Sequence, residues 1–122
     1  MSSTEILLAD KDRYFAEIYQ EFLEENDFSV SIKDSQDSAF QLAKQKQPSL
    51  VLTEILLKNG DGFELTKQLK KDGETSFIPV VFFSCLGEKS DVDQAFKLGA
   101  ENFLIKQHND KQEVLKLLNT FK

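Results

Sequence analysis

The sequence predicts an α/β fold in which helices cover both faces of a doubly wound parallel sheet. Two patterns support this prediction. Short apolar runs alternate along the chain with segments whose apolar residues recur at helical spacing. The run Leu50-Val51-Leu52 has no period-two alternation, which is typical of a strand that is buried on both faces. Because the connections between runs are short and helical, right-handed crossovers are expected.

Five apolar runs are the expected strands, at residues 5–9, 28–32, 50–54, 78–83 and 102–105. The second run alternates Phe28, Val30 and Ile32 with polar residues, so we expect it at an edge of the sheet with one wetter face. Pro79 can stand only near the beginning of the fourth strand, because it has no N–H to donate.

A helix is expected after each strand, beginning where a short polar side chain can accept a hydrogen bond from a free backbone N–H. In chain order the candidate caps are Asp10 or Asp12, Asp37 and Ser38, Ser90 with Asp93, and Asp110 with Glu113. The third helix follows the turn at residues 58–62, whose glycines are expected to supply positive-φ positions.

The length of 122 residues predicts one domain, residues 1–122. Hydrophobic residues make up 40% and charged residues 30%, as in ordinary globular proteins. The lone Cys85 excludes an internal disulfide. Residues 1–5 do not form a secretory signal pattern, and no apolar run is long enough to span a bilayer. We therefore expect a cytoplasmic protein without a membrane partner.

The net charge of −6 and the pI near 4.8 argue against nucleic-acid binding, because phosphate contacts need a basic face. This charge favours a protein partner or a cation. His108 stands apart from any nucleophile or metal ligand in the sequence, so we assign it no role.

Polar residues follow four of the predicted strands, and a parallel sheet brings such strand ends to one edge. They are Asp10, Lys11 and Asp12, then Glu54, Ser84 and Lys106. Carboxylates can hold a divalent metal, a hydroxyl can donate to a phosphoryl oxygen, and a lysine can neutralise charge. This combination suits the transfer of a phosphoryl group to a carboxylate.

Together these stretches resemble the receiver domain of two-component response regulators, over essentially the whole chain. The resemblance is carried by residues 6–10, 48–55, 61–65, 78–84 and 98–106, through their order and spacing. It implies a flavodoxin-like fold with strand order 2-1-3-4-5.

The resemblance also implies residue roles. In that family an acidic pair after strand one and an Asp after strand three bind Mg²⁺, and that Asp accepts phosphoryl from a histidine kinase. A hydroxyl residue ends strand four, a Lys ends strand five, and an aromatic residue in strand five changes rotamer with the signalling state. Asp10 corresponds to the first acid, Ser84 and Lys106 to the phosphate contacts, and Phe103 to the switch residue.

Three residues depart from the family pattern: Glu54 replaces the phosphoacceptor Asp, Lys11 replaces the second acid, and Gln107 replaces a Pro. A Glu carboxylate lies about 1.5 Å farther out than an Asp carboxylate. A misplacement of about 1 Å can cost on the order of a hundredfold in rate. Lys11 also makes Mg²⁺ binding hard to sustain, so we expect no cofactor. Asp10 and Glu54 remain the candidate metal ligands if Mg²⁺ does bind.

These departures suggest an atypical receiver, which is not an enzyme and whose pocket is closed by a pair between Glu54 and either Lys11 or Lys106. Such a domain would act by docking to a histidine kinase or a downstream signalling protein. The resemblance implies contact through helix four, strand five and helix five, where the candidate residues are Lys97, Phe103, Gln107 and Lys111.

Three alternatives remain open at the level of sequence. The chain could be a receiver that still uses Mg²⁺ and is phosphorylated by a histidine kinase. It could be a haloacid-dehalogenase-like phosphatase, because Asp10 and Asp12 follow a strand as Asp-x-Asp, although a further acidic pair is lacking. A flavodoxin-like cofactor binder would need a hydroxyl- and glycine-rich loop after strand one, where this chain has acids.

Overall fold

The computed structural model describes residues 3–122, and Met1 and Ser2 lie outside the described residues. Its centre is a five-stranded parallel sheet in the order β2-β1-β3-β6-β7. The strands are β1 (Thr4–Ala9), β2 (Phe28–Lys33), β3 (Leu50–Thr53), β6 (Val80–Ser84) and β7 (Asn102–Ile105). This order is the predicted 2-1-3-4-5 of the five expected strands, so the fold prediction is confirmed, including the edge position of β2.

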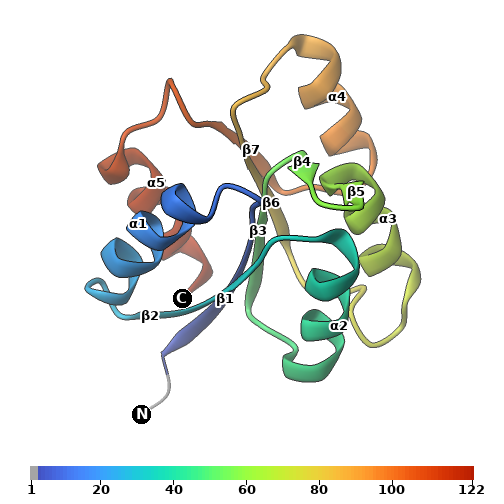
Figure 1. Cartoon of the computed structure of the whole chain (residues 1–122), viewed down its shortest axis with the longest axis horizontal. Helices are drawn as coiled ribbons and strands as arrows, with labels where there is room; N and C mark the ends of the chain where they lie inside the picture. The colour runs from blue at the N-terminus through green and yellow to red at the C-terminus, as the bar shows by residue number, and fades with distance from the viewer. Residues whose placement is uncertain (1–2) are drawn as a thin grey trace.

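Helices cover both faces of the sheet (Figure 1). On one face lie α1 (Arg13–Glu24) and α5 (Lys111–Leu118), which a 3₁₀ turn (Asn119–Phe121) extends. On the other lie α2 (Gln36–Lys46), α3 (Gly62–Lys71) and α4 (Lys89–Lys97). No helix within residues 3–122 is long and apolar enough to cross a membrane.

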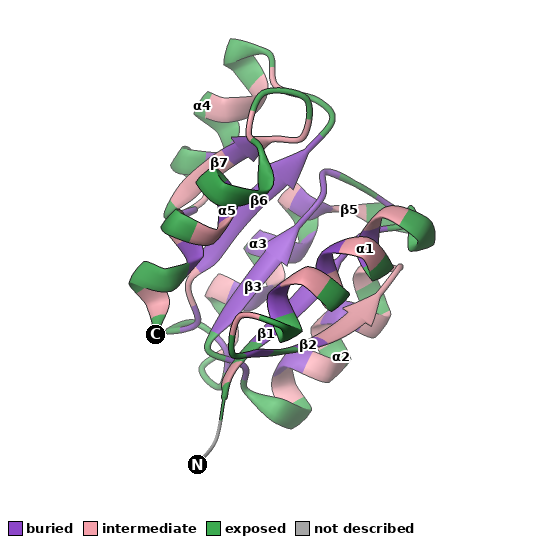
Figure 2. Ribbon diagram, turned by 90° about the vertical axis from the view of Figure 1, so that its left-hand side faces the viewer, coloured by how far each residue is buried: buried purple, intermediate pink, exposed green. Residues whose placement is uncertain are grey.

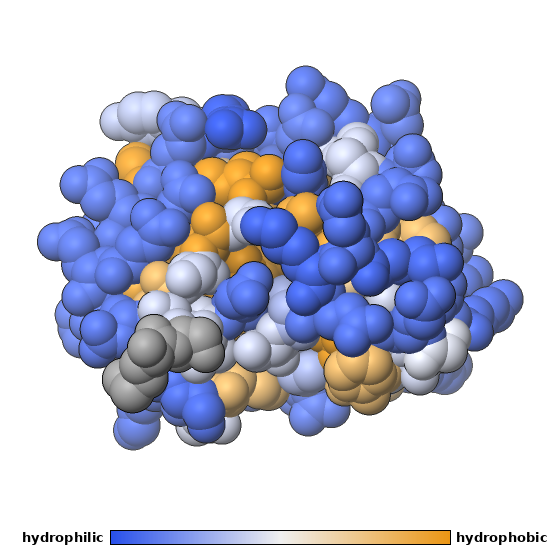
Figure 3. Space-filling model, turned by 90° about the horizontal axis from the view of Figure 1, so that it is seen from below, coloured by the Kyte–Doolittle hydropathy of each residue, from blue (hydrophilic) through white to orange (hydrophobic). Residues whose placement is uncertain are grey.

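Each central strand packs apolar side chains against the helices on both faces of the sheet. This is why apolar and polar residues do not alternate in its sequence. In β1, Ile6 and Leu8 pack toward α1 and α5, whereas Leu7 packs toward α2 and α3. Figure 2 shows these central strands as buried and the outward faces of the helices as exposed. The end of the molecule seen in Figure 3 has apolar residues at its centre, framed by hydrophilic ones.

Helix starts agree with the predicted caps at two places and differ at two. Asp12 caps α1, and Asp110 with Glu113 forms the capping box of α5. The predicted caps of α2 and α4 were wrong. Ser35 caps α2 and Glu88 opens α4 in a box with Asp91. Both helices begin earlier than expected. An N-cap needs an extended backbone as well as an acceptor side chain, and Ser35 and Glu88 have that backbone conformation.

A small antiparallel hairpin that the sequence did not suggest follows Glu54, made of β4 (Leu56–Leu57) and β5 (Gly60–Asp61). Gly60 has a φ of +146°, as predicted for this turn. Gly62 does not have a positive φ. It is needed for close approach instead, because a Cβ there would strike the backbone carbonyl of Glu54. The hairpin and the start of α3 are thereby held against the strand end that carries Glu54.

Candidate functional site

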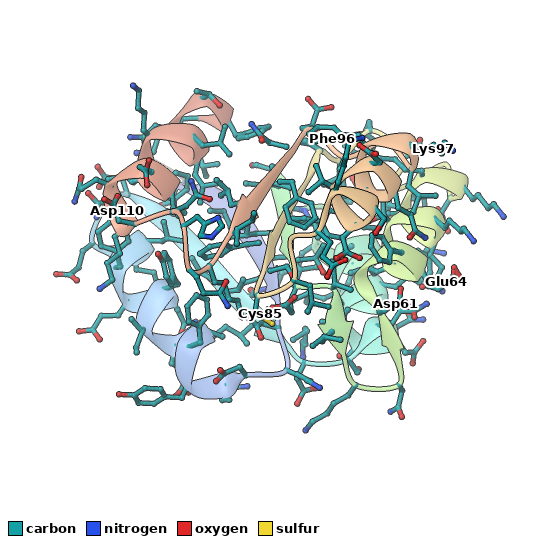
Figure 4. All side chains as sticks on the ribbon, turned by 90° about the horizontal axis from the view of Figure 1, so that it is seen from above. Asp61, Glu64, Cys85, Phe96, Lys97 and Asp110 are labelled. Atoms are coloured by element: carbon teal, nitrogen blue, oxygen red, sulfur yellow. The ribbon has the colours of Figure 1, made fainter. Side chains whose placement is uncertain are left out.

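The sheet brings the predicted site residues to one end of the molecule. Asp10 follows β1, Glu54 follows β3, Ser84 ends β6, and Lys106 follows β7. This is the end seen in Figure 4, where Cys85 lies in the middle. A pocket of about 210 Å³ opens there, lined by Asp10, Lys11, Asp12, Phe15, Glu54, Leu56, Cys85 and Lys106.

The carboxylate of Glu54 is buried and held by hydrogen bonds from three sides. Its Oε1 atom accepts from the Ser84 hydroxyl and from the backbone N–H of Ile55, the latter at 2.7 Å. Its Oε2 atom accepts from the backbone N–H of Cys85 at 3.1 Å. Burial alone would raise the pKa of Glu54. The bond from Ser84, the charge of Lys106 and the Cys85 N–H instead hold that pKa below its usual value.

Lys106 connects the two buried carboxylates of the site. Its Nζ lies 2.8 Å from Oδ2 of Asp10 and 3.1 Å from Oε2 of Glu54. Burial alone would lower the pKa of Lys106, but these two anions raise it. Burial also raises the pKa of Asp10, because Asp10 has fewer hydrogen-bond donors to offset its desolvation. One ammonium thus neutralises part of the charge of two acids.

Lys11 and Asp12 are exposed at the mouth of the pocket. Asp12 accepts a hydrogen bond from the Phe15 N–H at 3.1 Å, so its carboxylate caps α1. Within residues 3–122 Lys11 makes no salt bridge. Of the two lysines that the sequence offered to Glu54, the structure pairs Lys106 and leaves Lys11 in solvent.

A family model described as the response regulator receiver domain matches residues 6–119 of this chain. The chain belongs to this family. Protein PilH of Pseudomonas aeruginosa is 33% identical over 97 residues, which cover 80% of this chain and 79% of PilH. The phosphate regulon transcriptional regulatory protein PhoB of Escherichia coli K12 is 29% identical over 112 residues, which cover 92% of this chain and 49% of PhoB. This receiver spans about half the length of several curated relatives that it matches.

Solved receivers show the same fold. The chemotaxis response regulator CheY4 of Vibrio cholerae superposes with a TM-score of 0.89 at 16% identity, over 99% of this chain and 100% of that one. The BeF3-activated receiver domain of Klebsiella pneumoniae RstA gives a TM-score of 0.86 at 22% identity, over 96% and 97% of the two chains. Receiver domains as a class interact with histidine kinases and downstream effectors.

The carboxylates that would hold the Mg²⁺ ion implied by the family have other partners in this structure. The ammonium of Lys106 already bridges Asp10 and Glu54, and the carboxylate of Asp12 caps α1. Lys11 contributes a positive charge where the family has an acid. No group of three His, Cys, Asp or Glu residues that could hold a metal is found between residues 3 and 122. A Mg²⁺ ion bound here would have to share the carboxylates of Asp10 and Glu54 with the Lys106 ammonium, and the two cations would repel each other.

The predicted switch residue, Phe103, is half-buried on the face that carries α3 and α4. Its ring stacks on Phe82 with centroids 5.6 Å apart and planes 2° from parallel. Gln107, which replaces the family Pro, is exposed and donates a hydrogen bond from its side chain to the Cys85 carbonyl at 3.4 Å. Phe103 therefore sits on β7 beside the site without touching its charges.

Two groups in the site were missed by sequence reasoning. The backbone N–H of Cys85 is one of them, and the place of Cys85 directly after Ser84 at a strand end is the sequence signal that could have indicated it. Phe15 was assigned only to the core, because it begins the apolar stripe of α1. The structure places its ring 4.0 Å from the Lys106 Nζ. No sequence pattern distinguishes such a ring from ordinary core filling.

Proposed function

We propose that this receiver is atypical: Glu54 permanently occupies the place of the phosphoryl group, and the domain signals by docking, without enzymatic activity of its own. The partners of the Glu54 carboxylate support this most directly. They are the Ser84 hydroxyl, the Cys85 N–H and the Lys106 ammonium. By the family resemblance, the hydroxyl and the lysine at these positions contact phosphoryl oxygens. Here they already contact a carboxylate of the protein itself.

The attraction between Glu54 and Lys106 opposes the entry of a phosphoryl group into the site. At 3.1 Å, attraction between Glu54 and Lys106 is about 5 kcal/mol at an effective dielectric near 20, before desolvation is subtracted. A phosphoryl donor would have to displace this pair and the bond from Ser84. The carboxylate oxygen of Glu54 also lies farther from the backbone than that of an Asp would, and such a misplacement slows phosphoryl transfer.

Docking is proposed for the face made by α4, β7 and α5, toward a histidine kinase or a downstream signalling protein and without nucleic-acid or membrane contact. Phe96 is 46% exposed on α4 and lies next to Lys97, as Figure 4 shows. Phe103 lies on β7, and Lys111 begins α5 with its Nζ 5.3 Å from the Phe22 ring of α1. An exposed aromatic side chain such as that of Phe96 is of a type that is enriched in protein interfaces.

Titration with Mg²⁺ and beryllofluoride, followed by backbone amide NMR, tests the proposal. We expect no saturable shifts at Glu54, Ser84 or Phe103 in the wild type. The matched control is the double variant Glu54→Asp with Lys11→Asp, which restores the family pattern and is expected to respond. Each single variant is measured beside it, to separate the phosphoacceptor from the metal ligand.

Mass spectrometry after incubation with acetyl phosphate gives an independent measurement. We expect no added phosphate on the wild type and addition on the double variant. Phosphate on the unaltered chain, or saturable shifts around Glu54, would contradict the proposal. Either result would support the alternative of a receiver that still works through Mg²⁺ and phosphorylation.

A further inference from the structure

The Lys106 ammonium has a third neighbour besides its two carboxylates. Its Nζ lies 4.0 Å from the ring centroid of Phe15, on the first turn of α1. Only 12% of the Lys106 side chain remains exposed. A cation this close to a ring face is attracted by the ring's quadrupole, and more strongly when both are desolvated.

The Phe15 ring is held by other aromatic rings. It packs on Tyr19 with centroids 5.0 Å apart and on Phe83 with centroids 5.4 Å apart. Tyr19 and Phe83 meet each other edge to face at 5.0 Å. Phe83 belongs to β6, one residue before Ser84. The ring is thus fixed between α1 and the sheet, in contact with the Lys106 ammonium.

We infer that Phe15 is a positioning residue that retains the Lys106 ammonium between Asp10 and Glu54 and shields it from water. This inference rests on the proposed function, because it explains what keeps an internal cation where the family uses a metal. Two carboxylates alone would also hold a lysine whose head remained hydrated. The ring face attracts the cation and offers competing water only a weak hydrogen-bond acceptor.

The ammonium resonance of Lys106 in isotope-labelled protein provides the test, read by NMR near neutral pH. In the wild type we expect slow exchange of its protons with water and a ring-current shift of the adjacent methylene. Phe15→Leu keeps an apolar side chain but removes the ring. We expect the ring-current shift to vanish and proton exchange to accelerate on the order of tenfold, the factor set by a desolvated cation–π contact. Phe15→Tyr keeps the ring and is expected to restore both signals.

Phe22→Leu is the matched control. Phe22 is another partly buried α1 residue, and its ring lies 5.3 Å from the Lys111 Nζ, away from the site. This variant should leave the Lys106 signals unchanged. The inference is overturned if Phe15→Leu leaves exchange unchanged, or if Phe22→Leu accelerates it equally. These outcomes are independent of the Mg²⁺ and beryllofluoride titration of the wild type, whose positive result would instead overturn the proposed function.

Discussion

Asp10 and Glu54 are nearly inaccessible to water, at 1% and 2% exposure, and both depend on one lysine for charge compensation. A buried ion pair adds little net stability compared with apolar groups of the same size. Removing one partner is different, since it leaves the other charge buried and unpaired. The site is therefore sensitive to loss of Lys106 in particular.

Lys106→Met is expected to lower the free energy of unfolding by about 3–5 kcal/mol, because it leaves two facing carboxylates without a cation. Urea unfolding followed by circular dichroism measures this loss. Lys89→Met is the matched control, because Lys89 pairs with Asp93 on the surface of α4 and its side chain is 89% exposed. The control should unfold at nearly the wild-type urea concentration. An equally small effect of Lys106→Met would show that Asp10 and Glu54 do not depend on Lys106 for charge compensation.

At the scale of single residues, the sequence predicts which types gather but not which ones touch. Lys11 and Lys106 are both candidates for Glu54 from the sequence, because both follow strands that end at the same edge. Which of them turns inward depends on the path of the backbone after each strand. After β1 the chain bends into the cap formed by Asp12, which leaves Lys11 in solvent.

At the scale of elements, β7 is an edge strand of the sheet. The backbone N–H groups that point away from the sheet donate to nearby asparagine side chains. The Phe103 N–H donates to the Asn102 side chain at 2.8 Å, and the Ile105 N–H donates to the Asn109 side chain at 2.8 Å. Lys106, one residue on, donates its N–H to β6 instead. An uncovered edge is a template for pairing with another strand. The outward N–H groups of Phe103 and Ile105, with which another strand would pair, are therefore already occupied.

Replacing both asparagines, Asn102→Ala with Asn109→Ala, is expected to expose this edge. Amide hydrogen exchange should accelerate at Phe103 and Ile105, because their hydrogen-bond acceptors are gone. Exchange at Lys106 is the internal control, since its N–H bonds to Ser84 and should change little. Unchanged protection of Phe103 and Ile105 would mean that the flanking helices, and not the asparagines, cover the edge.

Most elements could be predicted because apolar residues mark them, as continuous or alternating runs in the strands and at helical spacing in the helices. A run such as Val80-Val81-Phe82-Phe83 has no plausible place outside a doubly covered strand. The β4–β5 hairpin could not be predicted, because two residues a side carry no periodicity. Its existence depends on tertiary contacts, among them the bond from the Asp61 N–H to the Gln36 side chain at 3.2 Å.

At the scale of the whole molecule, the three charged groups of the site make folding depend on pH in opposite directions. The pKa of Glu54 is lowered from its ordinary 4.5, so its contribution to stability is present above 4.5 and is lost as the pH falls through the lowered value. The pKa of Asp10 is raised from 3.8, so the folded state takes up this proton more readily and acidification relieves a penalty. The raised pKa of Lys106 matters only in alkali, above 10.5.

Glu54→Gln should therefore reveal the acid-dependent part of the fold's stability. The difference in unfolding free energy between wild type and variant is expected to be constant from neutral pH down to about 5. It should then shrink below 4.5, because the protonated carboxyl of Glu54 and the amide that replaces it in the variant are both neutral.

Asp10→Asn is a control of opposite sign, against which the wild type should gain stability on acidification. Urea titrations at a series of pH values measure both differences, and a flat difference for Glu54→Gln would mean that the carboxylate keeps its ordinary pKa in the folded protein. Opposite slopes for the two variants would show that the same edge of the sheet holds one acid tuned toward ionisation and one tuned against it, with Lys106 shared between them.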